Sequence, residues 1–350
     1  MVMGEYSILE PNYKSIVMAI DRYVYANIEE SSHNQVVLTD FNLKLNWQWQ
    51  NETIKLTPDD PRINFVENAM NIVGQYLREQ EIMIDHFSLT IHSELDDKSG
   101  IKYGLGSSAA VVTAVITAIL TKYLPHTPAK ELIFKLASIA HVITQKNGSG
   151  ADIAASTYGG VLLYSAFQAE WLLNAYEQSA SITNLIDDNW PYFSLHQIEF
   201  PKKLEICVGW TGKPASTGNL VQKILRYQRV FPEEYGQFLY SSKLSLKKIL
   251  QGIAENDLDL IFKGIQGARL SLYSLGVVSG TNIETPLLKK LSDLSDEFGG
   301  AGKLSGAGGG DCGIALMPTK EAANKLIQEW EKAGIKPLDL AISQEGASIV

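Results

Sequence analysis

The sequence predicts a two-domain protein of mixed α+β class. Its 350 residues exceed what one hydrophobic core usually organises, because domains average roughly 150 residues. Segments with strand-like patterns alternate along the chain with segments whose apolar residues recur at helical spacing. Hydrophobic residues make up 45% of the chain and charged residues 20%, which is ordinary for a globular protein.

The first part of the chain is predicted to open with strands and then to mix helices with strands. Extended or alternating apolar patterns predict strands at residues 14–28, 36–49, 85–95 and 160–166. Helical spacing predicts helices at residues 64–80, 107–123, 129–144 and 153–158. A domain boundary is expected between residues 170 and 200.

Beyond that boundary, helices dominate before a final section of mixed structure. We predict a strand at residues 204–210, a loop at 211–218, long helices between 220 and 275, and a helix at 285–298. Residues 301–316 are expected to run from a glycine loop into a strand, followed by a helix at 320–333 and a strand at 336–342.

Composition and charge argue against several classes of protein. The formal net charge is −9, and no basic run with interleaved aromatic residues offsets it, so we expect no nucleic-acid partner. No apolar stretch reaches the roughly 20 residues that span a bilayer, so we expect no membrane role. The start of the chain lacks a signal-peptide pattern and only two cysteines occur, which together predict a cytoplasmic protein.

The six histidines show no spacing typical of metal ligands, so they are expected to be surface or core residues. They are His33, His86, His92, His126, His141 and His196.

The first of three glycine loops has the sequence GLGSSAA and spans residues 104–110. Its glycines permit close backbone approach, its hydroxyls can reach phosphate or Mg²⁺, and an apolar helix follows at once, which predicts an anion site. The plainer alternative is a tight turn before a core helix, which Ser107 or Ser108 would cap.

A dinucleotide site is a further alternative for this loop, because Gly104, Gly106 and Ala109 fit the G-x-G-x-x-A pattern. Against it, no acidic residue occurs between residues 110 and 130, where a ribose-binding carboxylate is expected. A Walker A loop is absent, since Glu297 stands where glycine is required, and the protein-kinase motifs are missing.

The second loop, KNGSGAD at residues 146–152, places Asp152 where it can accept or orient a proton in catalysis. Its alternative role is that of a helix N-cap. The third loop lies in SGAGGGDCGIAL at residues 305–316, whose dense glycines suggest a ligand site, although a hairpin turn would also account for them. Lysines beside glycine loops are informative in an anionic protein; these are Lys102, Lys146, Lys213 and Lys303.

Three motifs in this order resemble the family of galactokinase, homoserine kinase, mevalonate kinase and phosphomevalonate kinase, the GHMP kinases. They are GEY at residues 4–6, GLGSSA at 104–109 and SGAGGGD at 305–311, and their spacing agrees over essentially the whole chain. The resemblance implies an N-terminal domain at residues 1–190 like the second domain of ribosomal protein S5. It also implies a ferredoxin-like C-terminal domain at residues 191–350.

Within the family, the segments KYGLGSSAAV, NGSGADIA and VGWTGKPAS look most like bacterial phosphomevalonate kinases. This resemblance implies transfer of the ATP γ-phosphate to 5-phosphomevalonate, giving 5-diphosphomevalonate in the mevalonate route to isoprenoids, with ATP and Mg²⁺ required. The alternatives are mevalonate kinase or another small-molecule kinase of the family, and a non-catalytic ATP-binding relative. A monomer and a homodimer are both open.

The resemblance also implies roles for particular residues. Lys102 and Asp152 would act at the reacting phosphates. The ATP phosphates would contact Gly104, Leu105, Gly106, Ser107, Ser108 and Ala109, with Ser107 or Ser108 near the metal. The substrate would contact Ser149, Ser216, Ser305, Gly306, Ala307, Gly308 and Gly309. Arg22, Lys146 and Lys213 are weaker candidates for pairing with the substrate's anionic groups, and Glu5 is expected to be structural.

The family further leads us to expect a strand ending in a P-G-K-like element about eight to ten residues before GEY. Here Gly4 stands three residues after Met1. Either the natural start lies further upstream, or the protein lacks that strand and its lysine.

Overall fold

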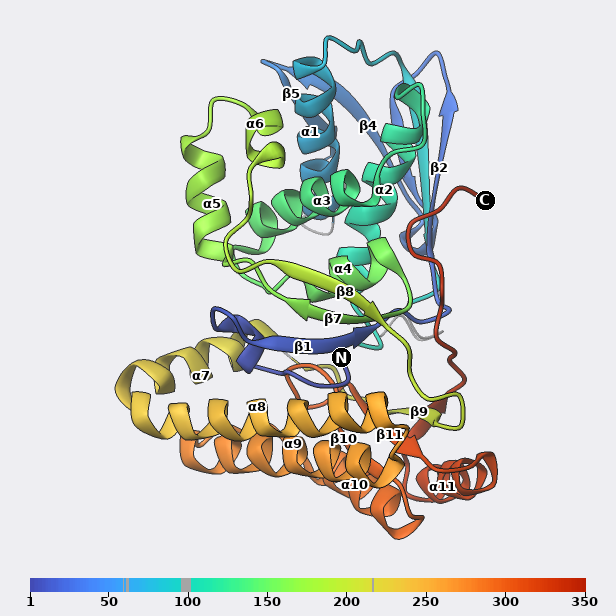
Figure 1. The fold of residues 1–350 in the computed structure, drawn as a ribbon. Helices are drawn as coiled ribbons and strands as arrows, with labels where there is room; N and C mark the ends of the chain where they lie inside the picture. The colour runs from blue at the N-terminus through green and yellow to red at the C-terminus, as the bar shows by residue number, and fades with distance from the viewer. Residues whose placement is uncertain (59, 61–62, 96–101, 216) are drawn as a thin grey trace.

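The structure is a computed structural model that describes residues 1–350 except 59, 61–62, 96–101 and 216. It mixes helices and strands throughout, and the α+β class is confirmed. Figure 1 shows a half with most of the strands and a half dominated by long helices, which meet near β1 (Lys14–Met18).

The upper half in Figure 1 is built on a five-stranded sheet in the order β2-β6-β3-β4-β5. Its strands are β2 (Val24–Glu30), β6 (Phe87–Ser93), β3 (Gln35–Leu38), β4 (Leu43–Gln50) and β5 (Thr53–Thr57). All neighbouring pairs are antiparallel except β3 and β6, which are parallel. Along β4, buried Leu45 and Trp47 alternate with exposed residues, so one face of the sheet is turned toward the core.

Two helices pack against this sheet, namely α1 (Asn64–Glu79) and α2 (Ser107–Tyr123), and α3 (Lys130–Gln145) packs on both of them. The sequence predicted each within about one residue at either end. α2 is apolar almost all round because it is enclosed by α1, α3, β2 and α4 (Ala151–Tyr158). Enclosing α2 in this way fixes its N-terminus, where the first glycine loop ends.

A second sheet has the order β1-β7-β8, with β7 (Val161–Ser165) and β8 (Ser194–Ile198). The single extended segment predicted at residues 14–28 is therefore wrong, because β1 pairs with β7 while β2 pairs with β6 in the other sheet. Between β7 and β8 lie α5 (Ala169–Gln178) and α6 (Ile182–Asp187), neither of which was predicted, and β8 was missed as well. The domain boundary at residue 190 stays a prediction.

The lower half contains α7 (Thr217–Val230), the long antiparallel pair α8 (Pro232–Glu255) and α9 (Leu258–Ser279), and α10 (Pro286–Glu297). A four-stranded sheet has the order β10-β11-β9-β12 and packs against α9, α10 and α11 (Lys320–Lys332). Its strands are β10 (Ala301–Leu304), β11 (Cys312–Met317), β9 (Glu205–Trp210) and β12 (Lys336–Leu338). Two predictions need correction here: α7 begins inside the expected loop, and residues 301–304 form a strand before the third glycine loop.

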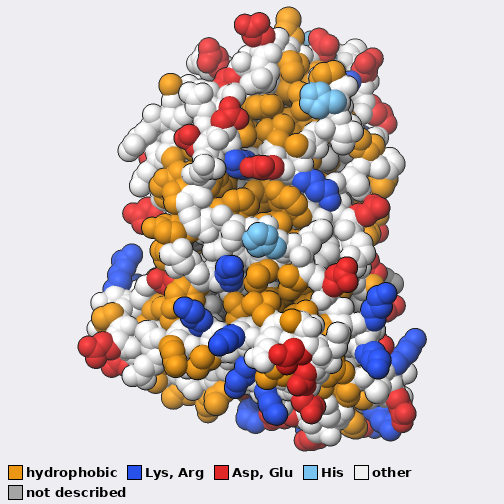
Figure 2. Space-filling model, viewed as in Figure 1, with side chains coloured by type: hydrophobic (Ala, Val, Ile, Leu, Met, Phe, Trp, Pro, Cys, Tyr) orange, Lys and Arg blue, Asp and Glu red, His pale blue; other side chains and the backbone are white. Residues whose placement is uncertain are grey.

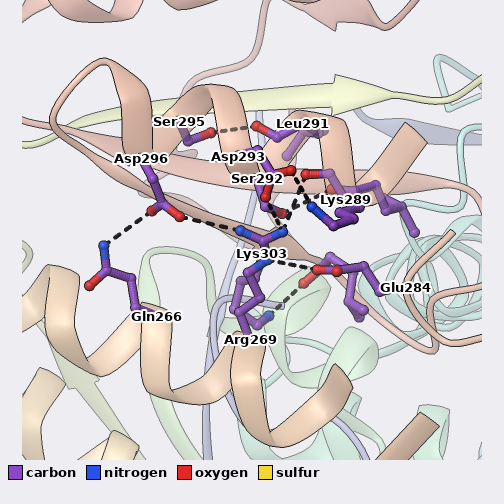
Figure 3. Close-up of polar contacts among 12 residues, drawn as sticks. Gln266, Arg269, Glu284, Lys289, Leu291, Ser292, Asp293, Ser295, Asp296 and Lys303 are labelled. Carbon is purple, nitrogen blue, oxygen red and sulfur yellow. Dashed lines mark hydrogen bonds and ion pairs between the residues drawn. The ribbon is translucent and has the colours of Figure 1, made fainter. Parts of the chain in front are cut away.

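Arg269 holds α9 against α10 and the turn before it (Figure 3). Its guanidinium donates to Glu284 at 2.7 Å and to Asp293 at 2.6 Å, and a third bond of 3.2 Å reaches Asp296. A partly buried guanidinium with several carboxylate partners is worth more than a lone surface ion pair. The cluster therefore fixes the helices that support β10 and the glycine loop following it.

The C-terminal segment returns to the upper half and runs alongside it (Figure 1). Ile342 bridges Ile20, the amide of Gly160 donates to Ser343 O at 2.7 Å, and the amide of Ala347 donates to Thr157 O at 3.1 Å. These backbone contacts tie the end of the chain to residues just after β1, just before β7 and at the end of α4. None of the helices in the described part of the chain is long and apolar enough to cross a membrane.

Candidate functional site

A cavity of about 1770 Å³ is lined by residues from both halves of the molecule. All three glycine loops contribute to its wall, although they are separated by up to 200 positions in the sequence. The predicted site residues in the lining are Lys102, Gly104, Leu105, Gly106, Ser107, Ser108, Ala109, Ser149, Asp152, Ser305, Gly306 and Ala307. Ser216 lies outside the described residues.

The first glycine loop leads directly into α2. Gly104 and Gly106 have φ angles of +77° and +84°, which glycine adopts without strain, and Gly106 is the residue before the first helical turn. Neither Ser107 nor Ser108 caps the helix, so that expectation is wrong: both already lie within the first turn. Their hydroxyls and the free amides of this turn line the cavity, an arrangement suited to binding an anion.

Asp152 lies in the first turn of α4, and its side chain makes no capping hydrogen bond. The N-cap position belongs to Gly150, so the alternative role for Asp152 as a cap is wrong. Its carboxyl group packs against Gly106: a Cβ atom at Gly106 would lie 3.3 Å from Asp152 Cγ. The second loop therefore places a carboxylate directly beside the first.

The third loop joins β10 to β11 as the connection of an antiparallel hairpin. Ser305, Gly306 and Ala307 line the cavity, and Tyr6 of the GEY motif donates a 2.6 Å hydrogen bond to Ala307 O. Gly308 and Gly309 are not brought to the cavity wall. A Cβ at Gly308 would lie 2.3 Å from Ile283 O, and the Gly309 amide donates to the same oxygen, so both pack against residues 282–283.

The cations beside the loops have different surroundings. Lys102, Arg22 and Lys146 line the cavity, whereas the side chain of Lys303 is fully buried and paired with Glu5. Burial lowers the pKa of the Lys303 ammonium, and Glu5 opposes this effect. Lys303 therefore belongs to a buried ion pair behind the third loop and not to the cavity wall.

On the face shown in Figure 2, Lys and Arg side chains gather over the lower half, while Asp and Glu predominate higher up. The positive charge visible on this face thus lies mostly on the part that carries the third loop.

His141 in α3 lines the cavity, although the spacing of the six histidines gave no reason to single it out. Its Nε2 atom lies 3.2 Å from the hydroxyl oxygen of Ser108, and its ring packs on Phe65 with centroids 5.1 Å apart. Burial lowers the pKa of His141, and the nearby Asp152 carboxylate only partly opposes this. The ring is therefore neutral near pH 7 and can accept a hydrogen bond from Ser108.

Asp311 is a second residue that was missed, although it ends the third glycine motif. It lines the cavity, and its carboxyl group packs on Gly104. The signal in the sequence was present, because Asp311 directly follows three glycines, but sequence position alone gives no partner for its side chain.

Away from the loops, the cavity extends along one face of α2. Thr113, Thr117 and Thr121 are four residues apart and line it together, opposite residues 24–28 of β2 and residues 345–350. Thr113 is only 2% exposed, and its hydroxyl has no hydrogen-bond partner among the described residues. The cavity thus extends from the start of α2, where the free amides are suited to an anion, into an arm along that helix lined by hydroxyls and Lys122.

Comparison with known proteins matches both halves of the chain. Residues 64–160 match the GHMP kinases N terminal domain, and residues 249–336 match the GHMP kinases C terminal domain. Phosphomevalonate kinase of Streptomyces sp. (strain CL190) is 31% identical, and the alignment covers 99% of this chain and 95% of that protein.

Solved structures agree with this match. A Lin0012 protein from Listeria innocua has a TM-score of 0.91 at 39% identity, covering 97% of this chain and 94% of its own. Streptococcus pneumoniae phosphomevalonate kinase in complex with phosphomevalonate and AMPPNP has a TM-score of 0.85 at 27% identity, covering 97% and 96%. The two-domain fold implied by the sequence motifs is confirmed. The chain belongs to the GHMP kinase family.

Proposed function

We propose that this protein is a phosphomevalonate kinase, which transfers the γ-phosphate of ATP to 5-phosphomevalonate and gives 5-diphosphomevalonate and ADP. The observation that carries the proposal is the single cavity in which three glycine loops meet, with Asp152 packed against Gly106. The named Streptomyces relative and the ligands named for the Streptococcus structure support this choice of donor and acceptor.

The start of α2 is the site proposed for the ATP phosphates. Residues 104–109 combine left-handed glycines with the first amides of a helix, whose N-terminus carries about half a unit of positive charge. The arm along Thr113, Thr117 and Thr121 has room for the rest of the nucleotide and presents hydroxyls to it. Backbone donors would thus hold the phosphates even though few cations line the cavity.

The reaction joins two anions, so the residues must mainly position them and neutralise charge. An oxygen of the acceptor phosphate forms a bond to the γ-phosphorus, while the bond from that phosphorus to the bridging oxygen breaks and ADP leaves. The acceptor is already ionised at neutral pH, so it needs little proton abstraction. Lys102 would stabilise the transferring group, and Asp152 would orient the reacting groups beside it.

The residues at this centre fit Mg²⁺, which prefers oxygen ligands and is commonly held by one or two protein groups plus substrate phosphates. Ser107, Ser108 and Asp152 supply such oxygens at the cavity wall. Among the described residues, no group of three His, Cys, Asp or Glu side chains could hold a metal ion by itself. When bound, the ion would neutralise phosphate charge.

A coupled assay of ADP release with purified protein, ATP and MgCl₂ tests the proposal. Three reactions are compared, with 5-phosphomevalonate, with mevalonate and without an acceptor, and mass spectrometry identifies the product. We expect ADP and diphosphomevalonate in equal amounts with phosphomevalonate only. Asp152→Asn should bind ATP and lose turnover.

Two outcomes contradict the proposal. Faster turnover with mevalonate than with phosphomevalonate would assign the protein to a sister activity of the family. ATP binding with no ADP formed from either acceptor would favour a non-catalytic relative.

A further inference from the structure

Asp311, at the end of the third glycine loop, is the residue at which three loops of the cavity meet. On one side lies the loop of residues 211–215, which follows β9, and on the other lies Gly104 of the first glycine loop. These segments are about 100 and 200 positions away in the sequence. Asp311 therefore connects the first glycine loop, in the upper half, to the 211–215 loop and its own glycine loop in the lower half.

The backbone of Asp311 is fully engaged with the 211–215 loop. Its carbonyl oxygen accepts from the Thr211 amide at 2.9 Å and from the Thr211 hydroxyl at 3.0 Å. Its amide donates to Lys213 O at 2.8 Å. These three hydrogen bonds continue the pairing of β9 with β11 beyond the ends of both strands, so the loop is held as an extension of the sheet.

The side chain of Asp311 completes the connection in both directions. Its Oδ1 atom accepts a 3.2 Å hydrogen bond from the amide of Ala215. On the opposite side, a Cβ atom placed on Gly104 would lie 2.5 Å from Asp311 Cγ and 2.7 Å from Oδ2. The carboxyl group thus fills the space between the two loops, and only glycine at position 104 leaves room for it.

A carboxylate at this place opposes the binding of anions, so its presence needs a reason. Burial raises the pKa of Asp311, although the hydrogen bond from Ala215 acts in the opposite direction. Among the described residues, no lysine or arginine forms an ion pair with it. A negative charge beside a phosphate site is costly, which argues that the group is kept for the position of its atoms.

Two residues of the 211–215 loop, Pro214 and Ala215, line the cavity. Ser305 and Ala307, which we expect to contact the acceptor, line it as well. A shift of this loop relative to Gly104 would therefore change the distance between acceptor and donor. Misplacement by about 1 Å can cost on the order of 100-fold in rate.

We propose that Asp311 is a positioning residue for the acceptor: it clamps the 211–215 loop against the first glycine loop and so sets where the acceptor lies relative to the ATP phosphates. The clamp itself is independent of the acceptor's identity, but its effect on turnover rests on the proposed function. The side-chain amide of asparagine keeps an oxygen at the Oδ1 position, whereas alanine removes it and leaves a gap beside Gly104.

The first test measures the clamp directly by hydrogen exchange of the folded protein without substrates. In Asp311→Ala, we expect the Ala215 amide to exchange at least about tenfold faster than in the wild type, because its hydrogen-bond acceptor is gone. Asp311→Asn should exchange within about threefold of the wild type, since it keeps the acceptor. Unchanged exchange in Asp311→Ala would overturn the clamp.

The second test separates acceptor binding from ATP binding by steady-state kinetics. Asp311→Ala should raise the KM for phosphomevalonate by about tenfold and leave the KM for ATP within about twofold, with Asp311→Asn largely restoring the acceptor KM. Equal losses in Asp311→Asn and Asp311→Ala would show that the charge acts directly and would overturn a positioning role. Equal increases in both KM values would show a general structural defect.

Two further variants complete these tests, one as a control and one as a replacement if Asp311→Ala does not fold. Glu297→Ala removes an exposed carboxylate of α10 and serves as a matched control that should change neither measurement. If Asp311→Ala does not fold, Thr211→Val removes one hydrogen bond to Asp311 O at nearly constant volume and should raise the acceptor KM in the same direction. If the wild type makes no ADP from phosphomevalonate, the proposed function fails while the exchange test still decides the clamp.

Discussion

The imidazole Nε2 of His141 lies 3.2 Å from the hydroxyl oxygen of Ser108 and joins α3 to the first turn of α2. A hydroxyl has one proton and two lone pairs. When the proton is donated to His141, the lone pairs of Ser108 are turned toward the remaining space, which is the cavity. The pair thus orients an oxygen at the place proposed for the ATP phosphates and Mg²⁺.

The His141–Ser108 pair predicts a non-additive effect on turnover. His141→Ala should lower kcat about fivefold to tenfold, the loss expected when one oriented hydrogen bond is removed. In a Ser108→Ala background the same change should have little further effect, because there is no hydroxyl left to orient. His141→Gln, which can still accept a hydrogen bond, should retain more activity than His141→Ala. Additive losses in the double variant would contradict this role.

Lys102 lines the cavity two residues before Gly104, and its side chain is exposed. We expect Lys102→Ala to lower turnover by more than about tenfold and to leave ATP affinity little changed, because a cation near the transferring phosphate acts mainly in the transition state. Stopped assays of ADP release and equilibrium binding of ATP measure the two quantities. Lys44→Ala, an exposed lysine on β4, is the matched control. Near-normal turnover would remove Lys102 from the catalytic residues.

Elements with strong local signals were predicted well from the sequence. The helix Ser107–Tyr123 was located to the residue, because a glycine-serine loop marks its start and an unbroken apolar run follows. By contrast, β1 and β2 were merged. The residues between them contain neither glycine nor proline, and their separation arises from pairing with strands far away in the sequence. α5 was missed because residues 170–200 were interpreted as a domain boundary, and Leu172 is the one residue of this helix that is fully buried.

The glycine loops could be found from the sequence, whereas the contacts between them could not. His141 and Asp311 reach their partners only through packing: Ser108 is 33 positions from His141, and Gly104 is more than 200 from Asp311. Lys303 shows the opposite error. It stands two residues before a glycine loop, but all four residues of β10 are buried and its side chain pairs with Glu5 in the interior. The roles of the remaining site residues stay predictions.

The Lys303–Glu5 ion pair predicts a large loss of stability when one partner is removed. Both side chains are at most 1% exposed, and Glu5 Oε2 has no hydrogen-bond partner among the described residues. Lys303→Met should therefore destabilise the protein by about 3–5 kcal/mol, because it leaves a buried carboxylate without its cation. The double variant Lys303→Met with Glu5→Gln should recover part of this loss. Urea unfolding measures both, and a double variant less stable than Lys303→Met would contradict the explanation.

Glu79 predicts a specific dependence of stability on pH. Its carboxylate accepts hydrogen bonds from the amides of Ile182 and Thr183 at 2.9 and 2.8 Å, and from the hydroxyls of Ser181 and Thr183. Partial burial raises the pKa of Glu79, but these hydrogen bonds outweigh it and lower the pKa to about 2. The carboxylate thereby holds the start of α6 against the end of α1.

A folded-state pKa below the ordinary value of 4.5 means that the ionised carboxylate stabilises the folded state. The contribution is fully present above pH 4.5 and is lost as the pH falls toward 2. Because the group is only partly buried, screening by solvent limits this contribution to about 1 kcal/mol. We expect Glu79→Gln to lower the free energy of unfolding at pH 7 by about this amount and to converge with the wild type near pH 2. Glu81→Gln, an exposed carboxylate nearby, is the matched control, and a deficit for Glu79→Gln that is constant from pH 7 to pH 3 would rule out ionisation as the cause.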